Sequence, residues 1–138
     1  MPTADDVIRG KASIIERTLR RMKEVYAADP GLKSFTHIDA MTLNIERACQ
    51  AAIDAAMHLT AREHLGLPRN SADAFRLLHR AGFLSEDTAR AMVAMTGFRN
   101  IAIHEYRELD ISVLHAVAAE RWTSIVDFCR ELGLTIRP

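Results

Sequence analysis

The stretch ERACQAAIDAAMHL, residues 46–59, decides the fold class. Its apolar residues recur every three to four positions, which is the spacing of one face of an α-helix. This spacing extends over a helix expected from about Thr36 to Leu65, with Ile38, Met41, Ile45, Ala48, Cys49, Ala52, Ile53, Ala56, Met57 and Leu59 as its apolar residues. Alanine dominates the middle of the segment, and small side chains let a neighbouring helix approach closely. The segment therefore predicts a long helix that packs tightly against others.

Helical spacing also dominates the segments on either side, and β-type alternation is nearly absent. We expect further helices at about 4–28, at 71–82, from residue 85 through TARAMVAMTGFRNIA, and from residue 110 onward. The first carries the apolar residues Val7, Ile8, Ile14, Ile15, Leu19, Met22 and Tyr26, and the last carries Ile111, Leu114, Val117, Ala118, Trp122, Ile125, Phe128, Cys129 and Leu132. The predicted fold is all-α: an up-and-down four-helix bundle with one short extra helix.

Turn-forming and capping residues mark the ends of these helices. Proline and glycine interrupt the pattern at residues 30–31 and 66–68, and Gly31 is expected to supply the permissive backbone of the first turn. Ser71, Ser85 and Asp110 are the expected N-caps, because their side-chain oxygens can accept from free backbone N–H groups. The boundaries agree with the helices that the apolar spacing predicts.

Composition limits the class of protein. The 138 residues are 49% hydrophobic and 26% charged, so we expect one folded domain over residues 1–138. Lysine plus arginine (18) balances aspartate plus glutamate (18), so no overall positive field attracts nucleic acid. Any such contact must come from a local patch, for which the clusters Arg17, Arg20, Arg21, Lys23 and Arg76, His79, Arg80 are weak candidates. Without a secretory leader or a long apolar run, the chain is expected to be soluble and cytoplasmic.

No metal or cofactor is expected. The six histidines form neither an H-x-x-x-H nor an H-E-x-x-H pattern, and Cys49 and Cys129 lie on apolar faces as inert thiols would. The sequence also lacks a glycine-rich phosphate loop and a G-x-S-x-G nucleophile turn. The common enzyme classes are therefore disfavoured.

The stretch GFRNIAIHEYR, residues 97–107, concentrates polar residues on a helix that is otherwise apolar. On a straight helix, Arg99 and His104 lie about 140° apart around the axis, so the two side chains do not share a face. A site formed by both needs either a helix that ends between Ala102 and Tyr106 or a second subunit. From the pattern alone, an ordinary helix end is favoured, with Arg99 compensating the helix dipole.

The chemical interpretation is RNA transesterification. Arginine binds phosphate through its planar guanidinium and keeps its charge, and histidine can take or give a proton near neutral pH. In this reading His104 is the general base or acid and Arg99 stabilises the charge that develops on phosphorus. The reaction uses the ribose 2′-hydroxyl as the nucleophile and needs no metal.

Arg99-Asn100-x-x-x-His104-x-Tyr106 resembles the extended Arg-x4-His motif of the HEPN superfamily (higher eukaryotes and prokaryotes nucleotide-binding), in the H-x-Y form of HepT toxins. The resemblance covers nearly the whole chain. Residues 67–114, LPRNSADAFRLLHRAGFLSEDTARAMVAMTGFRNIAIHEYRELDISVL, are similar to the second half of these toxins, and ERACQAAIDAAMHL is similar to their second helix. The F-x-x-L-x-x-x-G-x-L block at residues 75–84 makes the match specific.

This resemblance implies the toxin of a type VII toxin–antitoxin system, a homodimer whose two motifs line a shared cleft and cleave RNA without a metal. Arg99 and His104 would be catalytic, Asn100 would position one of them, and Asp54 is a candidate supporting acid. The resemblance further implies a minimal nucleotidyltransferase (MNT) antitoxin that adenylylates Tyr106, placing a bulky anion beside His104. The alternative is a non-catalytic subunit that binds a nucleotide or partner within a nucleotidyltransferase complex.

The residue pattern alone does not decide whether the chain forms a dimer. Met92 and Met95 lie on the helix that leads into the motif and can supply an apolar strip for a two-fold contact. Packing of both methionines in the core of one subunit is an equally good interpretation of the pattern.

Overall fold

The computed structural model describes residues 3–104 and 111–138, with side chains for 3–100 and 111–138. Tyr106 and Asp110 lie outside the described residues. The elements are α1 (Asp6–Ala28), α2 (Phe35–Arg62), α3 (Ser71–Arg80), α4 (Glu86–His104), α5 (Ile111–Ala116), the π-helical turn η2 (Val117–Arg121) and α6 (Thr123–Glu131). The described residues contain no strand, so the prediction of an all-α fold is confirmed.

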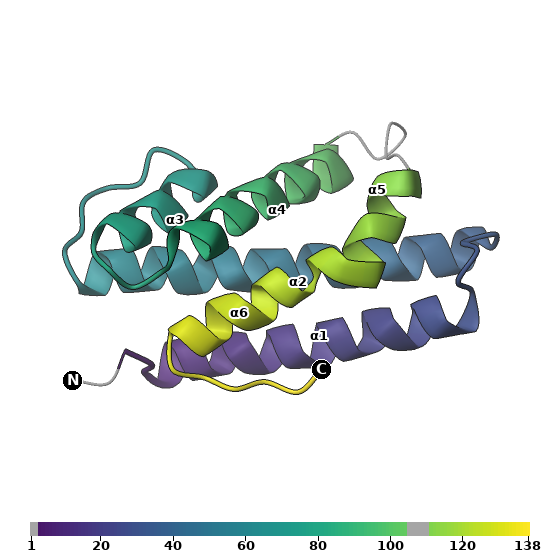
Figure 1. The fold of residues 1–138 in the computed structure, drawn as a ribbon, viewed down its shortest axis with the longest axis horizontal. Coiled ribbons are helices and arrows are strands. Elements are labelled where there is room, and N and C mark those ends of the chain that lie inside the picture. The colour runs from purple at the N-terminus through teal and green to yellow at the C-terminus, as the bar shows by residue number, and fades with distance from the viewer. Residues whose placement is uncertain (1–2, 105–110) are drawn as a thin grey trace.

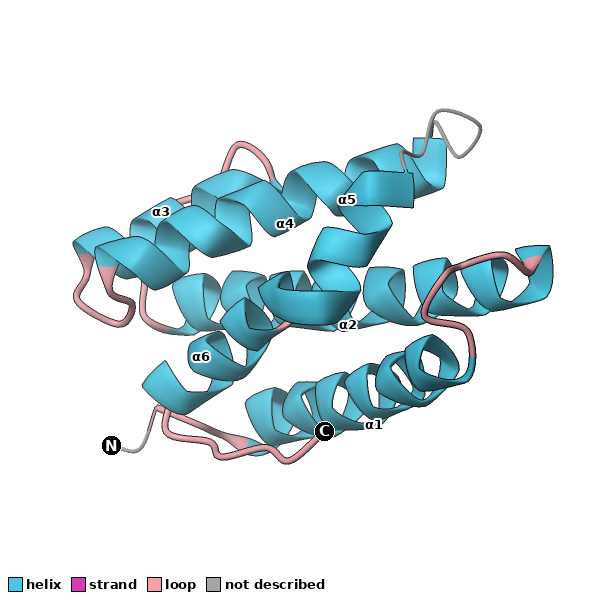
Figure 2. Cartoon of the chain, turned by 45° about the vertical axis from the view of Figure 1, so that its right-hand side comes forward, coloured by secondary structure: helices cyan, strands magenta, loops and turns pink. Residues whose placement is uncertain are grey.

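The helices form a bundle around α2 (Figure 1). Helix α1 runs antiparallel to α2 on one side, and α4 packs on the other side. The short helix α3 packs against α2 and α4, and the α5–η2–α6 segment crosses the bundle as its fourth long element (Figure 2). The predicted four-helix bundle with one short extra helix is therefore confirmed.

Small side chains allow the close packing of α2. Ala48, Ala52 and Ala56 are fully buried, and larger core residues such as Leu19 and Met22 of α1 are equally inaccessible. An edge-to-face contact between Phe75 and Phe128, with ring centroids 5.5 Å apart, joins α3 to α6. The alanine-rich stretch that predicts tight packing does lie in the core.

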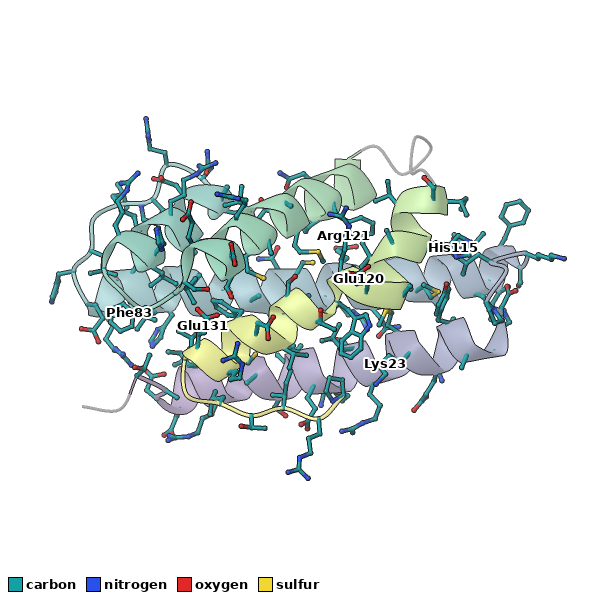
Figure 3. The ribbon with its side chains drawn as sticks, viewed as in Figure 1. Lys23, Phe83, His115, Glu120, Arg121 and Glu131 are labelled. Carbon is teal, nitrogen blue, oxygen red and sulfur yellow. The ribbon has the colours of Figure 1, made fainter. Side chains whose placement is uncertain are left out.

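A π-helical turn divides the last predicted helix into α5 and α6. The Trp122 N–H donates to the Val117 carbonyl oxygen at 3.1 Å, an i to i−5 bond that widens the helix. Lys23 of α1 lies 4.7 Å from the centre of the Trp122 ring and attaches the turn to the first helix (Figure 3). Because the apolar spacing is similar on both sides of this turn, the pattern does not reveal it.

Several local predictions need correction. Val7, Met57 and Ile111 are more than a third exposed, so they do not belong to the core stripes. Asn70, not Ser71, caps α3, because its side-chain oxygen accepts from the Asp73 N–H at 2.9 Å. In the turn after α1 the left-handed residue is Leu32, with φ of 49°, and not Gly31.

Polar contacts join the start of α1 to the end of α2. The Asp5 carboxylate caps α1 by accepting from the Ile8 N–H at 2.9 Å. It also contacts His58 Nε2 at 2.6 Å and Arg62 Nη1 at 3.1 Å. The hydrogen bond with His58, the Ile8 N–H and Arg62 together hold the pKa of Asp5 well below its usual value. No helix in the described part of the chain is long and apolar enough to cross a membrane.

Candidate functional site

The candidate site lies along α4, whose first turn is firmly anchored. Ser85 accepts the Thr88 N–H at 3.2 Å, which confirms it as the N-cap. The Glu131 carboxylate at the end of α6 accepts from the Ser85 N–H at 2.6 Å and also from the Thr88 hydroxyl (Figure 3). Burial alone would raise the pKa of Glu131, but these hydrogen bonds outweigh it and hold the pKa below its usual value.

Helix α4 includes residues 99 and 104, and residue 104 is the last of its residues that the structure describes. The two backbone positions are therefore about 140° apart on one helix. A chain that turns back after residue 104 concerns residues outside the described ones. Both ways to combine Arg99 and His104, a helix end and a second subunit, therefore stay predictions.

Arg99 lies on the face of α4 that packs against α2. It is half-buried, and its Nη1 donates to the side-chain oxygen of the exposed Asn100 at 3.1 Å. Its Nε is fully buried and has no hydrogen-bond partner in the structure as described. The thiol of Cys49 on α2 is close enough to feel the guanidinium: burial raises its pKa to about 12, and the positive charge opposes that rise. Arg99 thus retains an unused donor next to α2.

Asp54 belongs to a polar network on the same stretch of α2. Its carboxylate accepts from Lys11 Nζ at 3.2 Å and from Gln50 Nε2 at 2.8 Å. The other polar atom of the Gln50 amide, Oε1, is buried and has no partner among the described side chains. Gln50 directly follows Cys49, so this network and Arg99 border the same part of α2.

Lys11 and Gln50 were missed by the sequence interpretation. A sequence signal does exist for Gln50: it stands four residues before Asp54, and side chains one turn apart on a helix meet. Lys11 comes from another helix and has no such signal. Of the other candidate residues, His104 is described by its backbone alone, and Tyr106 falls outside the described residues.

A cavity of about 550 Å³ borders the motif between α4 and the α5–η2–α6 segment. Its α4 wall includes the small residues Ala91, Ala94 and Gly97, and its other wall includes Val113 and Arg121. Figure 3 shows Arg121 extending from the π-helical turn toward α4. Val113 is 41% exposed, so part of this face is both apolar and open.

Met92 and Met95 do not form an exposed strip. They are 1% and 3% exposed, which confirms packing in the core and makes the methionine-based dimer strip wrong. The open face beside the motif is formed instead by the small residues of α4 and by Val113.

The described histidines and cysteines have ordinary structural roles. Cys49 and Cys129 are buried, and burial raises the pKa of each to about 12. Four histidines contact single partners: His37 with Asp29, His58 with Asp5, His79 with the Leu84 carbonyl oxygen and His115 with Tyr26. Among the side chains that the structure describes, no group of three His, Cys, Asp or Glu could hold a metal ion.

Comparison with known proteins identifies close relatives. The sequence matches the family described as Ribonuclease HepT-like over residues 14–132. The mRNA nuclease HepT of Shewanella oneidensis is 36% identical over 115 residues, which are 82% of this chain and 86% of the relative.

Solved structures agree with the sequence match. A tri-AMPylated HEPN toxin of Shewanella oneidensis, in complex with its MNT antitoxin, superposes with a TM-score of 0.89 and 30% identity, covering 94% of this chain and 98% of that one. A toxin–antitoxin structure with AMP-PNP has a TM-score of 0.88 and 30% identity, covering 94% and 99%.

Proposed function

Because the chain belongs to the HepT-like ribonuclease family, we propose that it is the ribonuclease toxin of a type VII toxin–antitoxin pair. The observation that carries the proposal is the complete Arg99-Asn100-x-x-x-His104-x-Tyr106 motif in a chain that matches this family over residues 14–132. The substrate is RNA and the reaction is internal transesterification.

In the proposed reaction the ribose 2′-oxygen attacks the adjacent phosphorus. The 2′-oxygen to phosphorus bond forms and the bond from phosphorus to the 5′-oxygen breaks, which leaves a 2′,3′-cyclic phosphate and a 5′-hydroxyl. His104 takes the proton from the 2′-hydroxyl or gives one to the leaving oxygen. The Arg99 guanidinium neutralises the charge on the phosphorane, and no metal takes part.

The surroundings of Arg99 support this role. Arg99 is half-buried rather than fully buried, and a phosphate oxygen is a strong acceptor for a guanidinium. Asn100 holds Nη1 and so restricts the orientation of the guanidinium. Asp54, through Gln50 and Lys11, is proposed to support this part of α2 from behind the catalytic pair.

We propose that the active form is a homodimer. Arg99 and His104 flank the open face of α4 on opposite sides, and the cavity beside Gly97 and Val113 lies between them. A second copy on this face would bring the motif of each subunit to the border of the other. One subunit then completes the site that a single straight helix cannot form.

We further propose that Tyr106 is the target of the antitoxin. The tyrosine oxygen would attack the α-phosphorus of ATP, forming the oxygen to phosphorus bond and releasing pyrophosphate, while the phenol proton passes to solvent. A similar toxin is tri-AMPylated in complex with its MNT antitoxin, which supports this assignment. The added anion two residues from His104 would repel the RNA phosphate.

Cleavage by the purified chain tests the proposal. Arg99→Met, which keeps a side chain of similar length, and His104→Ala should each lower the cleavage rate of single-stranded RNA by about 100-fold or more. Cleavage by the wild type should persist in EDTA, because no metal takes part. Gel filtration should show the same dimer for all three proteins.

Tyr106→Phe separates catalysis from silencing. This variant should cleave RNA as the wild type does but should remain active after incubation with the antitoxin and ATP. If the wild type binds the nucleotidyltransferase tightly and cleaves no RNA, the chain is instead the non-catalytic subunit.

A further inference from the structure

A second groove, away from the motif, lies between α3 and α4. Its volume is about 350 Å³, and its lining includes Arg76, His79 and Arg80 of α3 with Glu86, Arg90 and Val93 of α4. Arg76 and Arg90 are each seven residues from Phe83, which lies in the connection between the two helices. The turn thus brings a third arginine to the basic cluster of α3.

The groove carries more positive charge than its neighbours neutralise. Arg76 and Arg80 are exposed and one turn apart, and neither forms an ion pair with a carboxylate in the part of the chain described here. Like charges at this spacing repel each other. Arg90 pairs with Glu86 at 2.8 Å, but both side chains are about 70% exposed, so solvent weakens this pair. An anionic ligand would relieve the repulsion.

His79 is fixed in this groove by the backbone. Its Nδ1 lies 3.0 Å from the Leu84 carbonyl oxygen. A carbonyl only accepts, so Nδ1 carries the hydrogen and Nε2 remains available for another hydrogen bond. The groove therefore presents one imidazole nitrogen beside its exposed arginines.

The groove lies on the same stripe of α4 as backbone position 104, the proposed general acid or base, while Arg99 lies on another face of the helix. Positions 90, 93, 97, 100 and 104 follow each other at intervals of three or four residues and so form one stripe of the helix. At 1.5 Å per residue, Arg90 lies about 21 Å along the axis from His104. A polyanion that extends from the cleavage site along this stripe reaches the arginines.

We propose that the α3–α4 groove binds the phosphates of the RNA strand that continues from the cleavage site. The proposal rests on the ribonuclease function proposed above and adds a binding site outside the catalytic motif. The overall charge of the chain is zero, so a local cluster of this kind supplies the electrostatic attraction for RNA. The contacts are to the backbone and carry no base preference.

The test measures binding of a fluorescein-labelled 20-nucleotide RNA with 2′-O-methyl ribose throughout, which cannot be cleaved by transesterification. The double variant Arg76→Gln/Arg80→Gln should bind about 10-fold or more weakly near 0.1 M salt. The slope of log affinity against log salt concentration should fall by about 1.4, because each phosphate contact on a single strand contributes roughly 0.7.

Arg17→Gln/Arg21→Gln is the matched control. These two arginines are also exposed and one turn apart, but they lie on α1, on the far side of α2 from α4 (Figure 1). This double variant should keep the affinity and the salt slope of the wild type. Cleavage adds a second readout: the KM for long RNA should rise in the groove variant and should stay at the wild-type value in the control variant.

Three results would overturn the inference, and each has a different consequence for the proposed function. If the groove variant keeps the wild-type salt slope while the wild type binds and cleaves RNA, the function stands and the RNA follows another path. If the groove variant binds RNA normally but no longer associates with the antitoxin, the groove is a protein interface. If the wild type neither binds nor cleaves RNA, the proposed function fails and the groove assignment fails with it.

Discussion

The first and last turns of α4 differ in how their polar groups are satisfied. At the start of the helix, Ser85 and Glu131 pair the free backbone and hydroxyl groups, and Met92 fills the core. Near the end, Arg99 has a buried Nε without a partner in the described structure, and Gly97 faces a cavity. The polar groups at the beginning of α4 are paired by its own chain, whereas its end combines an unpaired buried donor with a small residue at a cavity.

Met92→Ala should give the largest loss of stability. The side chain is 1% exposed, and truncation of a buried methionine leaves a cavity that costs about 2–5 kcal/mol. Urea unfolding followed by circular dichroism measures the loss. Met57→Ala is the matched control, since Met57 is 39% exposed, and it should cost under about 1 kcal/mol.

Val113→Ala extends this comparison to the open end. Val113 is 41% exposed and lines the cavity, so its truncation should change the free energy of unfolding by under about 1 kcal/mol. A loss as large as that of Met92→Ala would mean that both ends of α4 are equally part of the core, and the contrast between them would disappear.

Glu131→Gln tests the anchor at the start of α4. The carboxylate accepts from Ser85 and Thr88, and replacing a charged acceptor by an amide should cost about 1–2 kcal/mol at neutral pH. The folded-state pKa lies below the ordinary value of 4.5, so this contribution is fully present above pH 4.5 and is lost as the pH falls below it.

The wild type and Glu131→Gln should therefore converge in stability on acidification. Chemical unfolding at pH 7 and at pH 3 measures both values. Glu120→Gln, at an exposed carboxylate on η2, should behave like the wild type at both pH values (Figure 3). A constant difference between wild type and Glu131→Gln from pH 7 to pH 3 would show that the charge of Glu131 does not hold the helix.

The anchored end of α4 could be predicted and the open end could not, for a physical reason. Ser85 is a local signal, because an N-cap acts within three residues of itself. The partner of that cap, Glu131, is 46 residues away in the sequence, at the end of α6, and leaves no mark in the sequence near α4. Helix spans likewise follow from local spacing, whereas the π-helical turn, which ends beside the contact between Trp122 and Lys23 of α1, has no such local signal.

The contacts that form the candidate site could likewise not be predicted from local sequence signals. The motif from Arg99 to Tyr106 was identified by its resemblance to a family, since helix geometry alone favoured an ordinary helix end. The burial of Arg99 Nε and the Lys11–Asp54–Gln50 network depend on contacts between distant helices. The roles of His104 and Tyr106 stay predictions.

Gly97→Ala has the smallest expected effect on stability. It tests directly whether a second subunit covers the open end of α4. A Cβ added there meets nothing within 4 Å, so the substitution should stabilise a single subunit by about 0.5–1 kcal/mol through lower backbone entropy in the unfolded chain. If a second copy covers this face closely, the extra methyl group weakens the dimer. The gain in thermal midpoint should then be present at low protein concentration and should shrink as concentration rises.

Gly10→Ala is the matched control, because Gly10 is also helical and exposed with nothing within 4 Å of its added Cβ, and its gain should not depend on concentration. Identical behaviour of the two variants at every concentration would place the subunit contact elsewhere and leave Arg99 and His104 without the partner that their helix geometry requires.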